Sequence, residues 1–223
     1  KSGILAPLAW TLCLIFMTAI FTIPLGVSTA LYLEEFASDN LLNKIIKINV
    51  SNLAGVPSII YGLLGLAFFT YTLSLGKSLL AGALTMTLLV LPIVIIASQE
   101  AIRTIQPSLK DAAYALGATK WEVSKRIILP HSIGGIMSGI ILAMSRAIGE
   151  TAPILIISSI VFITTVPSGP LDRFTVLPLQ IYTWASFPKD DFRAIASTGI
   201  IVLLLILIVM NSIAVYVRFK TQD

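Results

Sequence analysis

Long stretches without a charged residue divide this sequence and limit the folds that it can adopt. Five of them are apolar over roughly the 20 residues that a helix needs to cross the hydrocarbon core of a bilayer. Inside lipid, a spanning helix satisfies its own backbone hydrogen bonds. We therefore expect an all-α, polytopic transmembrane helix bundle. The expected spans cover about 8–33, 50–73, 78–98, 132–163 and 194–217.

The composition excludes other broad classes of protein. Hydrophobic residues make up 57% of the chain and charged residues 12%, whereas soluble domains contain about 25% charged residues. These values exclude a disordered chain and argue against a soluble globular enzyme. One cysteine, Cys13, allows no internal disulfide and no cysteine-rich metal site. The lone His131 has no companion nearby, so we expect no metal ion.

The basic residues predict an orientation. Positive side chains collect on the cytoplasmic side of membrane proteins, and segment 99–131 is rich in them. If this segment is cytoplasmic, the N-terminus of the sequence lies outside, which leads us to expect a sixth span ahead of it in the full-length protein. We expect residues 1–223 to form a single transmembrane domain. The basic residues of segment 99–131 are Arg103, Lys110, Lys120, Lys125 and Arg126.

The segment between the third and fourth spans predicts two short helices. Pro107 fits the first turn of a helix rich in alanine. Gly117 stands where a left-handed glycine ends such a helix. Thr119 and Glu122 have the spacing of a capping box that starts the second helix. We expect Pro130 to end this second helix.

The same segment resembles the EAA loop of ABC importer permeases. That loop reads E-A-A, three residues, glycine, nine residues and I-x-L-P, and this chain departs from it only by Asp111 in place of glutamate. The resemblance implies that the first helix is a coupling helix, which docks on a separate ATP-hydrolysing subunit. The residues implied in this coupling are Asp111, Ala112, Ala113, Gly117, Ile127, Leu129 and Pro130.

A phosphate-binding loop for ATP is missing from the sequence. Gly76-Lys77-Ser78 matches the last residues of a P-loop, but the leading glycine of that motif would fall on Tyr71. We therefore expect a transport subunit that is not itself an enzyme and that has no cofactor of its own. ATP and magnesium would bind to the partner ATPase.

The fourth span contains two charges, Arg146 and Glu150. A charge near the centre of a bilayer costs about 2.5–3.5 kcal/mol on insertion scales, so it usually has a partner or faces a polar path. Spaced four apart, the two residues would share one face of a helix. They are either a structural pair that neutralises itself or an anion site, because the arginine fork fits phosphate oxygens. The residues alone leave both interpretations open.

The stretch from Arg146 to Pro153 resembles the membrane subunits of phosphate ABC importers. The ending Thr-Ala-Pro is similar to the PstA type rather than to its PstC-type partner. The resemblance implies a type I importer fold, with Arg146, Glu150 and Thr151 on the substrate path. Further stretches that look like this family are Leu31–Phe36, Gly55–Gly62 and Leu177–Trp184.

The resemblance implies a permease that translocates inorganic phosphate across a bacterial or archaeal plasma membrane, the inner membrane if the cell is Gram-negative. Its implied partners are a PstC-type permease, a dimer of ATP-binding subunits, a periplasmic phosphate-binding protein and the lipid bilayer, with no nucleic acid. One alternative is an importer of a related oxyanion such as sulfate, molybdate or phosphonate. The others are an ATP-independent channel or secondary transporter, and a signalling or scaffold subunit.

Overall fold

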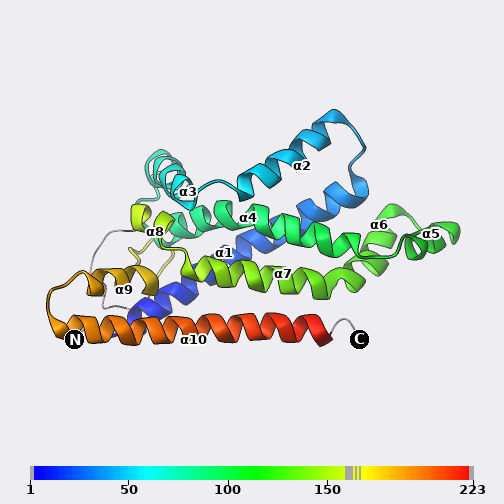
Figure 1. The fold of residues 1–223 in the computed structure, drawn as a ribbon. Coiled ribbons are helices and arrows are strands. Elements are labelled where there is room, and N and C mark those ends of the chain that lie inside the picture. Colours follow the sequence, from blue (N-terminus) through cyan, green and yellow to red (C-terminus); the bar gives the residue numbers. More distant parts are fainter. Residues whose placement is uncertain (1–2, 159–162, 164, 166, 221–223) are drawn as a thin grey trace. The chain divides into compact units, whose positions relative to one another are not determined.

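A computed structural model describes residues 3–158, 163, 165 and 167–220 of the chain. Within these residues the secondary structure is helical, apart from an isolated bridge between Ser78 and Arg173. The predicted all-α class is confirmed. In chain order (Figure 1), the helices are α1 (Leu5–Leu31), η1 (Tyr32–Phe36), α2 (Leu41–Ala54), α3 (Ser58–Gly65), η2 (Leu66–Thr72), α4 (Leu79–Arg103), α5 (Pro107–Ala115), α6 (Lys120–Val123), η3 (Ser124–Ile128), α7 (Leu129–Gly149), α8 (Ala152–Ile157), α9 (Leu177–Ala185) and α10 (Asp190–Lys220), where η marks a π-helical stretch.

Within the part of the chain that the structure describes, four helical segments are long and apolar enough to cross a membrane, and a fifth span results if the broken pair formed by α2 and α3–η2 counts as one. A polytopic helix bundle is therefore confirmed. The four segments are Leu5–Phe36, Leu79–Arg103, Lys120–Gly149 and Asp190–Lys220.

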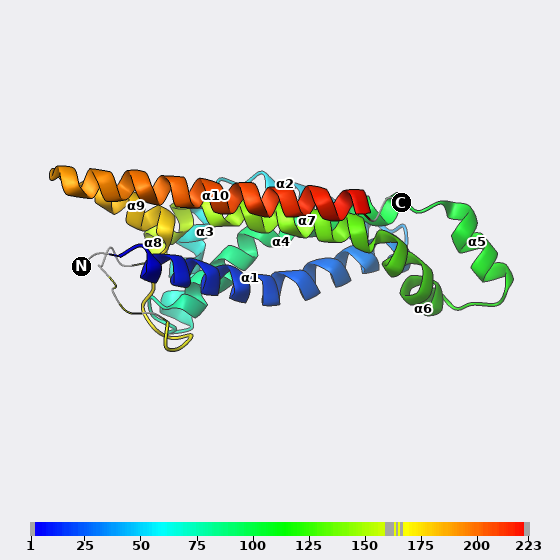
Figure 2. The ribbon, with the colours of Figure 1, turned by 90° about the horizontal axis from the view of Figure 1, so that it is seen from below.

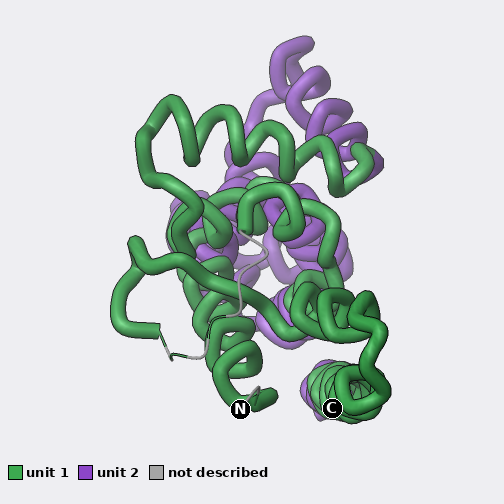
Figure 3. The backbone as a smooth tube through the Cα atoms, turned by 90° about the vertical axis from the view of Figure 1, so that its left-hand side faces the viewer, with its two compact units in different colours: residues 1–21, 56–89, 144–210 green, residues 22–55, 90–143, 211–223 purple. Residues whose placement is uncertain are grey.

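The chain divides into two compact units, coloured separately in Figure 3. The division falls within α1, α4, α7 and α10. The first unit comprises residues 1–21, 56–89 and 144–210, and the second comprises residues 22–55, 90–143 and 211–223.

The expected span over 50–73 is broken rather than continuous. α2 ends at Ala54, and α3 begins at Ser58 with Pro57 at its N-cap. Pro57 has no N–H to donate to a preceding turn, and proline also keeps the residue before it out of the helical conformation. The uncharged run of sequence is therefore long enough for a span, but its backbone is interrupted.

The expected span over 132–163 is also shorter than predicted. α7 ends at Gly149, and a separate helix, α8, starts at Ala152. Pro153 explains the break, because a proline clashes with the carbonyl group four residues earlier, which here belongs to Gly149. Residues 159–162 of the expected span lie outside the described residues.

Pro130 does not end the second of the two short helices expected between the third and fourth spans, so that prediction is wrong. It lies within one helical segment that runs from Lys120 to Gly149. The turn before it, η3, is π-helical, and the N–H of Leu129 donates to the carbonyl of Ser124 five residues earlier. Such a widened turn accommodates a residue that has no N–H, so the helix continues through the proline.

Glycines allow close helix contacts within each unit. In the second unit, a Cβ placed on Gly135 would lie 2.8 Å from Cβ of Ala101, and one on Gly139 would lie 2.6 Å from Cβ of Ala97. Both distances are shorter than real Cβ contacts, so the two glycines let α7 approach α4 closely. In the first unit, Gly62 of α3 faces the backbone of Pro153 in α8 in the same way.

Candidate functional site

The first of the two short helices between the third and fourth expected spans, α5, ends in a Schellman motif. The N–H of Ala118 donates to the carbonyl of Ala113 at 3.1 Å, and that of Gly117 donates to Tyr114 at 2.9 Å. Gly117 has φ +83°, a left-handed conformation that residues with a side chain rarely adopt. The predicted role of this glycine is confirmed. It fixes the direction in which the chain leaves α5.

The next helix, α6, starts with the predicted capping box. The N–H of Glu122 donates to Oγ1 of Thr119 at 3.3 Å, and the N–H of Thr119 donates to Oε2 of Glu122 at 2.9 Å. These two bonds satisfy backbone donors that a helix start otherwise leaves unpaired. Figure 2 shows α5 and α6 as two short helices joined by a loop. Local sequence therefore fixes both ends of the loop.

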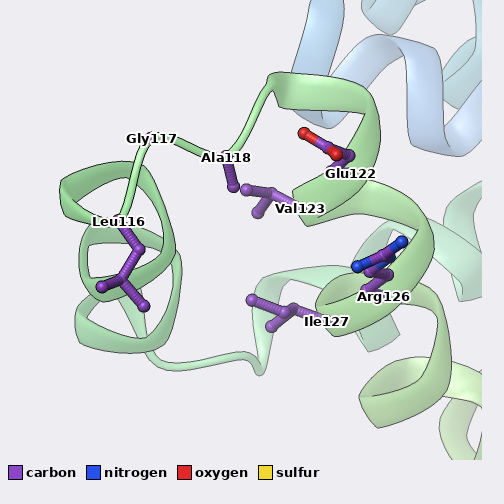
Figure 4. A pocket seen from close by; sticks show the side chains of 7 residues that line it. All are labelled: Leu116, Gly117, Ala118, Glu122, Val123, Arg126 and Ile127. Carbon is purple, nitrogen blue, oxygen red and sulfur yellow. The ribbon is translucent and has the colours of Figure 1, made fainter.

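A pocket of about 260 Å³ lies beside this loop. Figure 4 shows Leu116 at the end of α5, while Val123 and Ile127 come from the helix that follows the loop. Val123 is fully buried, whereas Leu116 is 90% exposed. The lining residues are Leu116, Gly117, Ala118, Glu122, Val123, Arg126 and Ile127.

Large apolar side chains are exposed on these two short helices. Leu109 is 42% exposed, Tyr114 40% and Trp121 61%. Leu116 is exposed as well, and the charge pattern predicts that this segment lies outside the bilayer. Exposed apolar patches outside lipid mark interaction surfaces. The sequence motifs do not include these residues. Large apolar side chains in short helices between spans are nevertheless a signal of an interaction surface that the sequence contains.

The predicted coupling residues have different environments within the second unit. Asp111 and Ala112 are exposed on α5, while Ala113 is buried. Ile127 and Leu129 are half-buried, and each lines a pocket. The acidic and small residues of the motif therefore lie on α5, and its apolar residues lie on the helix that leads into α7.

The charged pair of the fourth span lies at the end of α7 in the first unit. Nε of Arg146 is 3.6 Å from Oε1 of Glu150. The Arg146 side chain is 62% exposed and that of Glu150 is 20% exposed. Since α7 ends at Gly149, the pair joins the last turn of the helix to the residue after it, not two positions on one helix as expected.

The terminal nitrogens of Arg146 remain available for another acceptor. Its ion pair with Glu150 uses Nε, and the described part of the chain offers the guanidinium no other partner. Thr151 follows Glu150, is half-buried, and its Oγ1 lies 3.5 Å from the carbonyl of Gly149. A guanidinium whose terminal planar donors are free is suited to bind an oxyanion. Among the described residues, no cluster of His, Cys, Asp and Glu could hold a metal ion.

A second charged cluster lies in the second unit, around the acidic residues of η1. Glu34 accepts hydrogen bonds from Gln99 at 2.7 Å and from Arg103 at 2.9 and 3.0 Å. Glu35 forms an ion pair with Lys110 of α5. In the sequence, the stretch Leu31–Phe36 indicates only a family resemblance. The signal for a specific role was two adjacent carboxylates at the end of an apolar span.

Residues 22–222 match the protein family described as "Binding-protein-dependent transport system inner membrane component". The chain is 34% identical over 221 residues to the phosphate transport system permease protein PstA 1 of Mycobacterium tuberculosis, covering 97% of this chain and 71% of that protein. It is 33% identical over 217 residues to PstA of Yersinia pestis, covering 95% and 71%. A probable ABC transporter permease, YqgI of Bacillus subtilis, is 31% identical over 212 residues, covering 89% and 71%.

A solved structure has the same fold. A chain of the MetNI methionine ABC transporter, in an inward-facing conformation, superposes with a TM-score of 0.74 and covers 98% of this chain and 94% of its own length. The two sequences are 17% identical. At this identity the likeness shows the fold alone, and it confirms the expected importer-permease architecture.

Proposed function

Because the chain belongs to the family of binding-protein-dependent transport system inner membrane components, we propose that it is the permease through which an ATP-driven importer carries inorganic phosphate into the cell. It is a multi-pass membrane subunit of a bacterial ABC importer. The observation that carries the choice of phosphate is the 34% identity to PstA 1 over 97% of the chain.

Arg146, Glu150 and Thr151 form the proposed contact with phosphate on the translocation path. Glu150 pairs with Nε of Arg146. The two terminal nitrogens of the guanidinium therefore remain to donate hydrogen bonds to phosphate oxygens. Because Arg146 is exposed and pairs with Glu150 at 3.6 Å, the contact with the anion is a weak one. A weak contact suits transport, since a deep binding site on the path slows release.

The α5–α6 segment is the proposed docking surface for the ATP-binding subunit. Its exposed apolar side chains, Leu109, Tyr114, Leu116 and Trp121, provide the contact area. The Schellman motif and the capping box hold the two helices in one arrangement, so a displacement of α5 reaches α7 through a firm turn. ATP and magnesium bind on that partner, and this chain supplies the surface that moves.

The remaining proposed partners complete an importer of this build. They are a homologous permease of PstC type, two ATP-binding subunits and a periplasmic phosphate-binding protein. Alternating access follows when nucleotide binding stabilises one of two arrangements of the spans more than the other.

Uptake measurements test this function. Cells that lack this subunit are complemented with the full-length gene, and uptake of labelled phosphate and labelled sulfate is followed in parallel, with and without depletion of ATP. Restored, ATP-dependent phosphate uptake is the expected result. Restored sulfate uptake without phosphate uptake would overturn the choice of anion. Restored uptake that continues after ATP has been depleted would overturn the proposed coupling to an ATPase.

A further inference from the structure

The end of the first span holds two adjacent carboxylates that reach two different elements. Glu34 and Glu35 lie in the π-helical stretch η1, where the N–H of Ala37 donates to the carbonyl of Tyr32 five residues earlier. Neighbouring positions on a helix point in different directions. Glu34 contacts the last turns of α4, and Glu35 contacts α5. Single π turns occur frequently at functional sites.

Glu34 forms a contact of two parallel hydrogen bonds with Arg103. Arg103 donates Nε to Oε2 and Nη2 to Oε1 of the same carboxylate, a fork geometry that fixes the direction of both side chains. Nζ of Lys47, in α2, adds a further charge 3.7 Å from Oε1. The Glu34 side chain is 12% exposed. These contacts join the end of the first span to the end of α4 without involving α5.

The contact made by Glu35 joins the end of the first span to α5, the proposed coupling helix. Only residues 104–106 lie between α4 and α5, so α5 could pivot about this short connection. Lys110 of α5 meets Glu35 in an ion pair whose side chains are 23% and 8% exposed. Because both charges are mostly out of water, separating them is unfavourable. The ion pair limits the pivoting of α5 and ties it to the end of the first span.

We propose that the Glu35–Lys110 ion pair transmits the movement of α5 to the first span, so that Glu35 and Lys110 are positioning residues of the transport cycle. This inference rests on the proposed function, because it requires an ATPase that moves α5. The chain itself carries movement of α5 into α4 and α7, which flank it in sequence. The ion pair adds a route to α1, which lies some 75 residues away along the chain.

The test compares Glu35→Gln, Lys110→Gln and the exchanged pair Glu35→Lys with Lys110→Glu, each in the complete transporter reconstituted in vesicles with its binding protein. Phosphate uptake, basal ATP hydrolysis and the stimulation of hydrolysis by the phosphate-loaded binding protein are measured, together with copurification of the ATP-binding subunits. Glu100→Gln and Lys44→Gln are the matched controls, since both side chains are exposed and neither joins α5 to the first span.

We expect each single variant to assemble, to keep basal hydrolysis, and to lose about tenfold in uptake per ATP hydrolysed, a loss typical of a broken coupling between sites. Unchanged copurification of the ATP-binding subunits alongside the loss of uptake per ATP separates transmission from docking. The exchanged pair should recover most of the coupling.

Normal uptake per ATP in either single variant would overturn the inference, as would an exchanged pair that assembles but recovers nothing. A wild-type transporter that moves sulfate instead of phosphate would overturn only the proposed anion, and the ion pair would then be judged on sulfate uptake per ATP. Wild-type uptake that continues without ATP hydrolysis would overturn both proposals.

Discussion

Arg103 holds the carboxylate of Glu34 with two nitrogens, Nε to Oε2 at 3.0 Å and Nη2 to Oε1 at 2.9 Å. The two residues come from the ends of α4 and η1, so this fork fixes two spans to each other within the second unit. Gln99, one turn earlier on α4, donates to the same carboxylate at 2.7 Å.

Replacing Arg103 by lysine should loosen this junction. Lysine is a single point of charge and cannot form the fork, so one of the two hydrogen bonds is lost. Because the Arg103 side chain is 49% exposed, water screens part of the loss, and we expect a cost of about 1 kcal/mol. The apparent melting temperature of the purified complex measures it. Arg193→Lys, in an ion pair whose side chains are 68% and 96% exposed, is the control and should leave the melting temperature unchanged.

Replacing Gly117 by alanine should strain the end of α5. Nothing lies within 4 Å of a Cβ at this position, so the cost comes only from the φ of +83°, about 1–2 kcal/mol for a residue with a side chain. We expect weaker copurification of the ATP-binding subunits and lower phosphate uptake. Gly117→Asn should be milder, because asparagine tolerates the left-handed region. If Gly117→Ala and Gly117→Asn had equal effects, or if Gly55→Ala had an effect as large, the left-handed conformation of Gly117 would not be what matters for docking.

Replacing Arg146 by lysine should reduce phosphate uptake by about tenfold while the complex remains assembled, because the ammonium keeps the charge but not the planar donors. Initial rates of labelled phosphate uptake in vesicles, at equal amounts of complex, provide the measurement. Arg193→Lys serves as the matched control for an exposed arginine. If Arg146→Lys transports at the wild-type rate, the pair with Glu150 is structural.

Replacing Gly139 by alanine should push α7 away from α4. The added methyl would lie 2.6 Å from Cβ of Ala97, and overpacking of this kind costs about 1–3 kcal/mol. We expect less complex in the membrane and a lower apparent melting temperature. The compensating change Ala97→Gly in the same chain should restore both. A double variant no better than Gly139→Ala would show that the contact does not limit the approach of the helices.

Local signals in the sequence predicted the ends of α5 and the start of α6 well. Pro107 starts α5, Gly117 ends it, and Thr119 with Glu122 starts α6, because each of these effects involves residues only a few positions apart. The prediction that Pro130 ends a helix was wrong for a related reason. Whether a proline ends a helix depends on the preceding turn, and the π-helical bonding of η3 has no signal in the residues themselves.

The sequence by itself determined that the chain is a bundle of membrane helices, since long apolar segments in lipid have no other way to pair their backbone groups. It also determined the family, through motifs that are contiguous or closely spaced. Only the tertiary structure decided which charged residues meet. Glu34 and Gln99 are 65 positions apart, and Glu35 and Lys110 are 75 positions apart. The pairing of such distant residues depends on how the helices pack, and the pattern of charges along one chain allows many pairings of equal charge.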